Sequence, residues 1–132
     1  MDRYQVVRRV TGIILEHAKP NRIYVYGSEA SGEAKATSDI DIAFDDEHFS
    51  DMKVIEAKIQ EIPTLLHVDV KNLAFCEPRF VNRVKGTGRV LYSANKRLRF
   101  EDGLYNYSKA LERFKIVVKD RDRFAKEGYG DV

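Results

Sequence analysis

The stretch GSEASGEAKATSDIDIAF, residues 27–44, decides the fold. Its last six residues alternate strictly between large apolar side chains and small or acidic ones, which is typical of a strand with one buried face. Asp39 and Asp41 therefore point to the same side of this strand. Residues 27–38 are small, polar and glycine-containing, so we expect a loop that can hold one helical turn. The β-rich run RIYVYG at 22–27 makes this a loop between two strands.

The flanking sequence predicts further helices and strands. Apolar residues recur at helical spacing over residues 3–17, and Pro20 ends this helix. Residues 66–73 alternate again and place Asp69 in a third strand, opposite its apolar neighbours. The same patterns predict helices at 48–61, 77–84 and 102–126 and a last strand at 89–92. The sequence thus predicts an α/β (α+β) fold, a mixed β-sheet flanked by helices, with a C-terminal accessory helix.

The three strand aspartates are candidate metal ligands. Side chains two residues apart on a strand lie about 7 Å apart on one face, so Asp39 and Asp41 converge with Asp69 if its strand is a neighbour. Converging carboxylates repel one another unless a cation neutralises them. Ligation by oxygen alone favours Mg²⁺, or Mn²⁺, over zinc. Two such ions activate an attacking hydroxyl and stabilise the leaving oxygen in phosphoryl-type transfer.

Gly27 and Ser28 are candidate phosphate-binding residues. Gly27 permits close backbone approach, and Ser28 offers its hydroxyl and amide to phosphate oxygens. A Gly-Ser pair or an Asp-x-Asp motif alone is weak evidence, because turns and surface strands often contain them. Both motifs at this spacing, after a β-strand and with a third strand aspartate downstream, favour a nucleotide site over a purely structural role.

Composition favours a soluble globular protein, with 43% hydrophobic and 33% charged residues among 132. No apolar run approaches the roughly 20 residues of a membrane span, and the N-terminus lacks the pattern of a secretion signal. Cys76 is the only cysteine, so no internal disulfide can form and we expect a cytoplasmic protein. Residues 29–61 carry ten acidic and three basic side chains, whereas 79–99 carry seven basic and no acidic ones. This split suits an acidic cleft facing a basic wall, or a solvated basic face.

The motifs resemble a known family. GSEASGEAKATSDIDIAF is similar to the signature of the minimal nucleotidyltransferases, within the DNA polymerase β-like superfamily: Gly-Ser, a ten-residue spacer with small residues and a glycine, then Ser-Asp-Ile-Asp. HVDVKNL resembles the family's third-aspartate strand, and GRVLY its closing strand. The resemblance covers residues 1–95 and implies a polymerase β-like nucleotidyltransferase fold. It also implies that ATP is held through its triphosphate by Gly27 and Ser28, and two Mg²⁺ ions by Asp39, Asp41 and Asp69.

The resemblance also implies a reaction and a partner. Such proteins are commonly antitoxins of all-helical HEPN-type proteins, in some cases by adding AMP to a partner tyrosine. The implied function is therefore adenylyl transfer from ATP to a protein acceptor. One departure is Glu29, which puts a negative charge near the triphosphate where the family often has arginine. The alternatives are a degenerate fold that neutralises a helical partner by contact alone, and transfer to a small molecule such as an aminoglycoside. Nucleic-acid binding by residues 79–99 is disfavoured, because an aromatic-rich reading surface is lacking.

The C-terminal part is predicted to form a separate element. Residues 1–95 are the predicted nucleotidyltransferase domain, and 96–132 form a C-terminal helical extension. The segment YNYSKALERFKIVVKD resembles the first helix of the HEPN-type partners. A coiled-coil-like seam runs along helix 102–126 through Leu104, Tyr107, Leu111, Phe114 and Val118. The seam predicts a docking helix for a second copy or a helical partner; alternatively, it folds back onto its own sheet.

Overall fold

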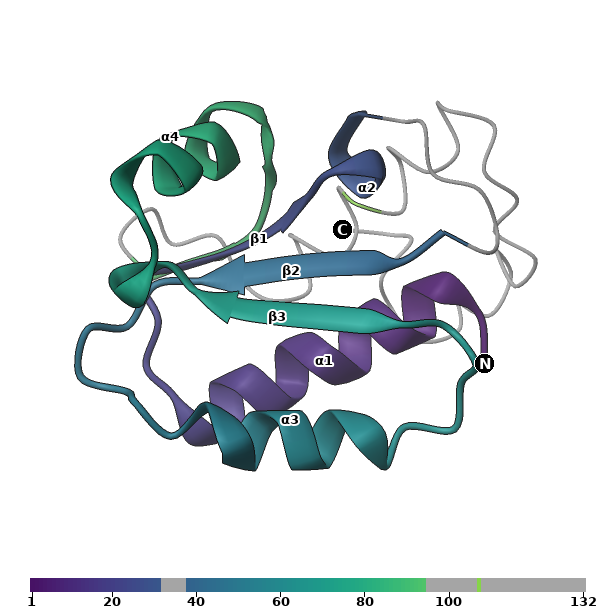
Figure 1. Ribbon diagram of the computed structural model, residues 1–132. Helices are drawn as coiled ribbons and strands as arrows, with labels where there is room; N and C mark the ends of the chain where they lie inside the picture. Colours follow the sequence, from purple (N-terminus) through teal and green to yellow (C-terminus); the bar gives the residue numbers. More distant parts are fainter. Residues whose placement is uncertain (32–37, 95–106, 108–132) are drawn as a thin grey trace.

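The computed structural model describes residues 1–31, 38–94 and Tyr107. Over these residues, helices and strands are arranged around one mixed sheet (Figure 1). In chain order they are α1 (Arg3–His17), β1 (Arg22–Tyr26), α2 (Ser28–Ser31), β2 (Ile40–Phe44), α3 (Met52–Gln60), β3 (Val68–Asn72), the 3₁₀ turn η1 (Leu73–Phe75), α4 (Pro78–Thr87) and β4 (Arg89–Ser93). The order of elements predicted for residues 3–93 is confirmed.

The sheet has the strand order β3-β2-β1-β4. Strand β2 is antiparallel to β1 and parallel to β3, and β4 is antiparallel to β1. The predicted fold class, a mixed sheet flanked by helices, is therefore confirmed. Residues that are partners across neighbouring strands share one face of the sheet, so the register decides which side chains meet.

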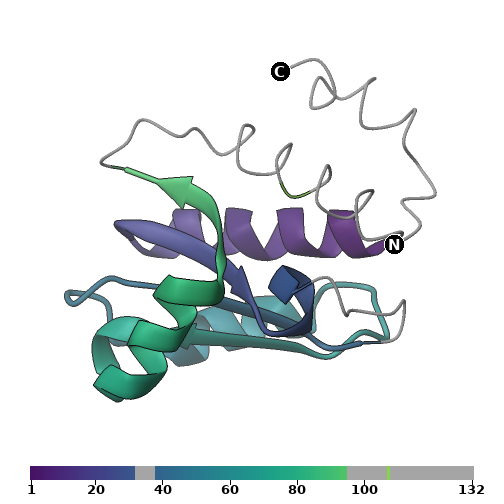
Figure 2. The ribbon, with the colours of Figure 1, turned by 90° about the horizontal axis from the view of Figure 1, so that it is seen from above.

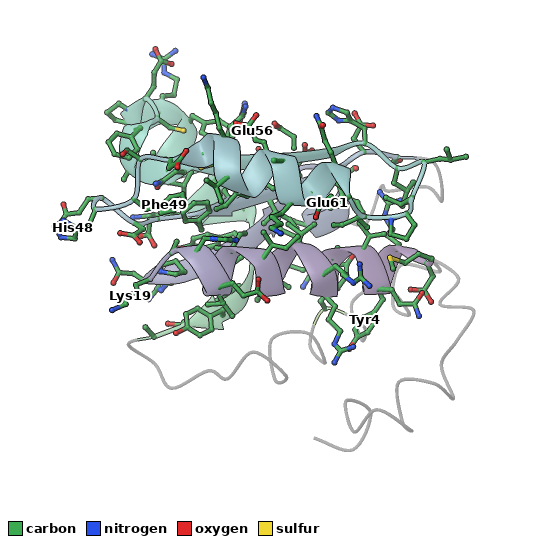
Figure 3. The ribbon with its side chains drawn as sticks, turned by 90° about the horizontal axis from the view of Figure 1, so that it is seen from below. Tyr4, Lys19, His48, Phe49, Glu56 and Glu61 are labelled. Atoms are coloured by element: carbon green, nitrogen blue, oxygen red, sulfur yellow. The ribbon has the colours of Figure 1, made fainter. Side chains whose placement is uncertain are left out.

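One face of the sheet carries the main core. Helices α1 and α3 lie side by side over this face, with Phe49 near the start of α3 (Figure 3). The ring of Phe49 contacts that of Phe44 edge-on, with centroids 6.1 Å apart. Residues of α1, β1, β2 and α3 fill the centre and are 0% exposed: Val7, Val10, Ile14, Ile23, Val25, Ile40, Ile42, Phe44 and Ile55. Burying each such side chain stabilises the fold by about 1.5–3 kcal/mol.

Helix α1 begins where its sequence provides a cap. Asp2 accepts a hydrogen bond from the Gln5 backbone N–H at 2.8 Å, and the Gln5 side chain accepts one from the Asp2 backbone N–H at 3.0 Å. This capping box satisfies donors that the first helical turn leaves without helical partners. One residue of the buried stripe is unexpected, because Arg3 lies at helical spacing from Val7 and Val10 and is 7% exposed.

The opposite face is only partly covered. Helix α4 lies over it near the carboxyl ends of β2 and β3, and β4 occupies the far edge of the sheet (Figures 1 and 2). A smaller cluster of buried side chains joins α4 to this face: Tyr24, Tyr26, Ala43, Leu73 and Val84. Toward the amino ends of β2 and β3, the side chains on this face are half-buried or exposed. The predicted metal ligands lie there.

The helix that follows β2 begins later than predicted, because a turn precedes it. The Asp46 carboxylate accepts a hydrogen bond from the His48 N–H at 3.0 Å, and the Asp46 carbonyl accepts one from the Phe49 N–H at 3.1 Å. These bonds hold residues 46–49 in a turn. Helix α3 therefore begins at Met52, later than the predicted position 48.

Tyr107 bears on the predicted accessory helix. It is helical, 1% exposed and part of the main core. This residue of the predicted seam therefore packs on the domain itself, as the fold-back alternative expects. Otherwise the predicted helix 102–126, its docking role and the extension 96–132 lie outside the described residues. In the described part of the chain, no helix has the length and apolar character needed to cross a bilayer.

Candidate active site

A row of polar side chains crosses three strands. Tyr26 of β1 is the register partner of Asp41 of β2, and Asp41 is the partner of Asp69 of β3. The three side chains therefore lie next to one another on the face opposite the main core. Asp39 directly precedes β2 and, two residues before Asp41, shares its face. The register thus places all three predicted carboxylates on one side of two adjacent strands.

Two basic groups lie beside this carboxylate row, which we define as Asp39, Asp41 and Asp69. The Lys71 ammonium nitrogen is 3.2 Å from Asp69 Oδ2, and these side chains are 44% and 38% exposed. His67 Nδ1 is 3.8 Å from Asp39 Oδ2, and this pair is more exposed still. At such exposure an ion pair contributes about 0–1 kcal/mol. The row is therefore flanked by basic groups that hold it only weakly.

The Gly-Ser turn lies against the middle carboxylate. Gly27 has a φ of 67°, a left-handed backbone conformation that favours glycine. A Cβ atom at this position would lie 2.9 Å from Asp41 Oδ2. Ser28 follows as the first residue of α2, and the Ala30 N–H donates to the Gly27 carbonyl at 3.1 Å. Gly27 is thus placed directly beside Asp41, and Ser28 follows it at the start of α2.

An aromatic shelf borders the row on its β1 side. Tyr26 is 8% exposed, and its ring meets that of Phe80 edge-on with centroids 5.6 Å apart. The guanidinium carbon of Arg83 lies 5.3 Å from the centre of the Phe80 ring. Burial, together with the charges of Asp69 and Asp41, raises the pKa of Tyr26 well above its usual range. Its hydroxyl therefore keeps its proton beside the carboxylates.

Two arginines hold the backbone at Ala30 and at Ser38 and Asp39. Arg3 of α1 donates from one guanidinium nitrogen to the carbonyls of Ser38 and Asp39, the latter at 3.1 Å. Arg89 of β4 donates from Nε to the Ala30 carbonyl at 3.2 Å. Hydrogen bonds to charged groups contribute about 1.5–3 kcal/mol each. These bonds hold the chain where it passes through α2 and where it enters β2.

The predicted site residues do not include Arg3, Tyr26 or Arg89. A signal for Arg3 does exist in the sequence, since an arginine on an otherwise apolar helical stripe requires a buried polar partner. The contacts of Tyr26 and Arg89 depend on the antiparallel pairing of β1 with β2 and β4. Hydrophobic alternation alone does not specify that pairing.

The donors of the row suit magnesium or manganese. All three are carboxylates, the hard oxygen ligands that these ions prefer. With the side chains as they stand, no group of three or more acidic, histidine or cysteine residues in the described ranges could hold a metal ion. Asp41 lies against Gly27, while Asp69 and Asp39 lie beside Lys71 and His67. Neighbouring strands are about 4.8 Å apart, so Asp39, Asp41 and Asp69 would hold the ions after their side chains turn toward one another.

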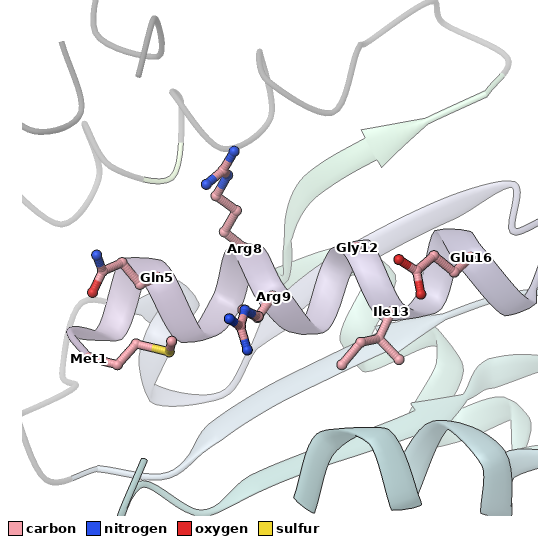
Figure 4. Close-up of a pocket in the computed structure, with 7 residues that line it drawn as sticks. All are labelled: Met1, Gln5, Arg8, Arg9, Gly12, Ile13 and Glu16. Atoms are coloured by element: carbon pink, nitrogen blue, oxygen red, sulfur yellow. The ribbon is translucent and has the colours of Figure 1, made fainter. Parts of the chain in front are cut away.

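A cavity lies elsewhere on the molecule. It has a volume of about 430 Å³ and runs along α1 from Met1 to Glu16 (Figure 4). Arg8 and Arg9 line it and project in different directions from the helix. Because α1 packs on the main-core face, the sheet separates this cavity from the carboxylate row. The cavity is not part of the candidate active site.

The mixed sheet, with a Gly-Ser turn set against paired strand aspartates, defines a nucleotidyltransferase. The family model described as polymerase beta, nucleotidyltransferase, matches residues 9–97, and the chain belongs to this family. The predicted family resemblance and enzyme class are confirmed. No curated protein sequence matches the chain.

Two solved structures share the fold. The first is a mutant of the toxin-antitoxin pair MntA-HpeT, with a TM-score of 0.54 and 16% sequence identity; the match covers 89% of this chain and 93% of that one. The second is a toxin-antitoxin structure with AMP-PNP, with a TM-score of 0.58 and 17% identity; the match covers 95% of this chain and 97% of that one.

Proposed function

We propose that this protein transfers AMP from ATP to a hydroxyl group of a protein acceptor, using Mg²⁺ or Mn²⁺ held by Asp39, Asp41 and Asp69. The observation that carries the proposal is the register that sets Asp41 beside Asp69 while Gly27 packs against the Asp41 carboxylate. Phosphate-binding and metal-binding groups thereby share one small region. The family membership and the AMP-PNP in one structural neighbour support the same assignment.

In this reaction the acceptor oxygen forms a bond to the α-phosphorus of ATP. The bond from that phosphorus to the oxygen bridging to the β-phosphate breaks, and pyrophosphate leaves. Asp69 takes the proton of the acceptor hydroxyl, while Gly27 and Ser28 hold the phosphate oxygens. Divalent ions, when bound, neutralise the carboxylates and the developing charge on the phosphate oxygens. Arg3 keeps Asp39 in place through the backbone that directly precedes β2.

We further propose that the protein is the antitoxin of a toxin–antitoxin pair and that its acceptor is the helical, HEPN-type toxin. Both structural neighbours are toxin-antitoxin structures, and each matches nearly the whole of this chain. In this scheme residues 1–95 form the catalytic domain and 96–132 a helical extension, of which Tyr107 packs on that domain. The burial of Tyr107 in the main core supports that arrangement.

The test uses ATP labelled at two positions. The full chain is incubated with Mg²⁺, a purified helical partner, and either α-³²P-ATP or γ-³²P-ATP. Nucleotidyl transfer labels the partner only from the α-phosphate, whereas phosphoryl transfer would label it only from the γ-phosphate. Label from neither, together with stable complex formation, would instead indicate a module that neutralises its partner by contact. An aminoglycoside added in place of the helical partner tests whether the nucleotide is transferred to a small molecule.

A further inference from the structure

Lys71 lies directly beside the carboxylate row, next to Asp69. It follows Asp69 by two residues on β3, so both side chains lie on the same face. Its register partner on β2 is Ala43, which is fully buried and small. The lysine stem therefore has no bulky cross-strand neighbour at that position and reaches along the strand to Asp69, with 3.2 Å between Nζ and Oδ2.

The ammonium and a divalent cation compete for the same oxygen. Asp69 stands opposite Asp41 in the register, so the natural place for a cation is between these two carboxylates. An ammonium within 3.2 Å of Asp69 Oδ2 would repel an ion bound to that oxygen. With its side chain 44% exposed, Lys71 is in a pair weak enough to exchange. When a nucleotide is bound nearby, a flexible lysine released from a carboxylate can bind one of its phosphates.

We infer that Lys71 is an exchangeable counter-ion of the row, which pairs with Asp69 before substrate binds and with a phosphate of the donor nucleotide afterwards. The inference rests on the proposed function and deepens it. It assigns a phosphate-binding role to a residue outside the Gly-Ser turn. It also explains why metal and nucleotide should bind cooperatively, since each favours release of Lys71 from Asp69.

The first measurement is the binding of Mn²⁺ to the full chain without nucleotide. The concentration of free Mn²⁺ is monitored by electron paramagnetic resonance. Lys71→Met removes the competing ammonium, and its affinity for Mn²⁺ should rise about two- to fivefold. Lys58→Met is the matched control, because Lys58 forms an exposed pair with Glu61 at 3.8 Å in and beside α3. This control should bind Mn²⁺ as the unmodified chain does.

The second measurement is binding of α,β-methylene-ATP at saturating Mn²⁺, by calorimetry. Lys71→Met should weaken this affinity about tenfold, because a charge-assisted bond to phosphate is lost. Lys71→Arg keeps a cation of similar reach and should retain most of the affinity. Opposite shifts for metal alone and for metal with nucleotide are the signature of exchange.

The outcomes separate the two proposals. If the unmodified chain binds the analogue no better with Mn²⁺ than without it, the proposed function fails and the inference fails with it. If that chain shows metal-dependent binding but Lys71→Met shifts both affinities in one direction, or neither, only the inference is overturned. If Lys71 merely supported the fold, Lys71→Met would weaken both affinities and lower the melting temperature.

Discussion

The parallel pair β2–β3 carries acidic residues toward both of its ends, and the two ends are built in opposite ways. Just past the carboxyl end of β2, Asp46 is 8% exposed and accepts hydrogen bonds from the backbone N–H groups of Lys19 at 2.8 Å and His48 at 3.0 Å. Asn72, at the end of β3, bonds to both the N–H and the carbonyl of Asp46. Toward the amino ends, the basic neighbours are exposed side chains: His67 lies 3.8 Å from Asp39, and Lys71 lies 3.2 Å from Asp69.

The comparison shows that residue type alone does not assign a role to an acidic side chain. A buried carboxylate whose two oxygens both accept hydrogen bonds from backbone N–H groups stabilises the fold and has no need of a cation. Asp41 and Asp69 lie on partner positions, where two carboxylates repel each other and a cation can neutralise them. The carboxyl end of the pair is therefore structural, and the amino end is the candidate site. The predictions below test this division.

The largest expected effect is on catalysis. Asp41→Asn removes the charge of the carboxylate that contacts the Gly27 turn, and AMP transfer should fall about 1,000-fold, as on losing a key electrostatic contribution. The free energy of unfolding should change by less than about 0.5 kcal/mol, or rise, because a repelled charge is removed. Radiolabel transfer and urea unfolding measure the two effects. A large loss of stability would make Asp41 a structural residue like Asp46.

The next effect belongs to the other end. Asp46→Ala leaves the backbone N–H groups of Lys19 and His48 without their acceptor, and the free energy of unfolding should fall by about 3 kcal/mol. Asp46→Asn keeps one acceptor oxygen, so its free energy of unfolding should fall by less. The folded fraction of each variant should transfer AMP at the normal rate, because the site lies at the opposite end of the strands. A selective loss of activity without loss of stability would break the division.

Much of this arrangement is predictable from the sequence, for stated reasons. Alternation in DIDIAF and around Asp69 predicts both strands and their acidic face, because side-chain direction depends only on local backbone geometry. Alternation does not reveal that Asp46 is buried, since its partners Lys19 and Asn72 are 27 and 26 residues away. Nor does it place Tyr26 opposite Asp41, which requires the strand order. Long-range pairing is the information that local patterns lack.

The third effect tests how the amino end is held. Arg3→Met keeps the length of the side chain but loses its bonds to the Ser38 and Asp39 carbonyls, and stability should fall by about 2 kcal/mol. Because Asp39 then loses its fixed backbone, affinity for metal with nucleotide should fall as well. Arg3→Lys keeps one donor group and should recover part of both. Equal nucleotide affinity in all three proteins would mean that Arg3 supports the fold alone.

The smallest effect concerns the turn that joins phosphate and metal groups. Gly27→Ala puts a Cβ 2.9 Å from Asp41 Oδ2 and forces a left-handed φ of 67° on alanine. The strain should cost about 1 kcal/mol of stability. Displacement of the Asp41 carboxylate should also weaken metal-dependent ATP binding. Gly12→Ala in α1 is the control, because a Cβ there meets no atom of the described residues within 4 Å; this change should stabilise the helix by about 0.5–1 kcal/mol. The melting temperature should fall in Gly27→Ala and rise in Gly12→Ala. Weakened nucleotide binding in Gly27→Ala alone would then locate the effect in the turn. If Gly27→Ala bound metal and ATP normally, the contact between the turn and Asp41 would not be required for binding, and the amino end of the pair would depend on its carboxylates alone.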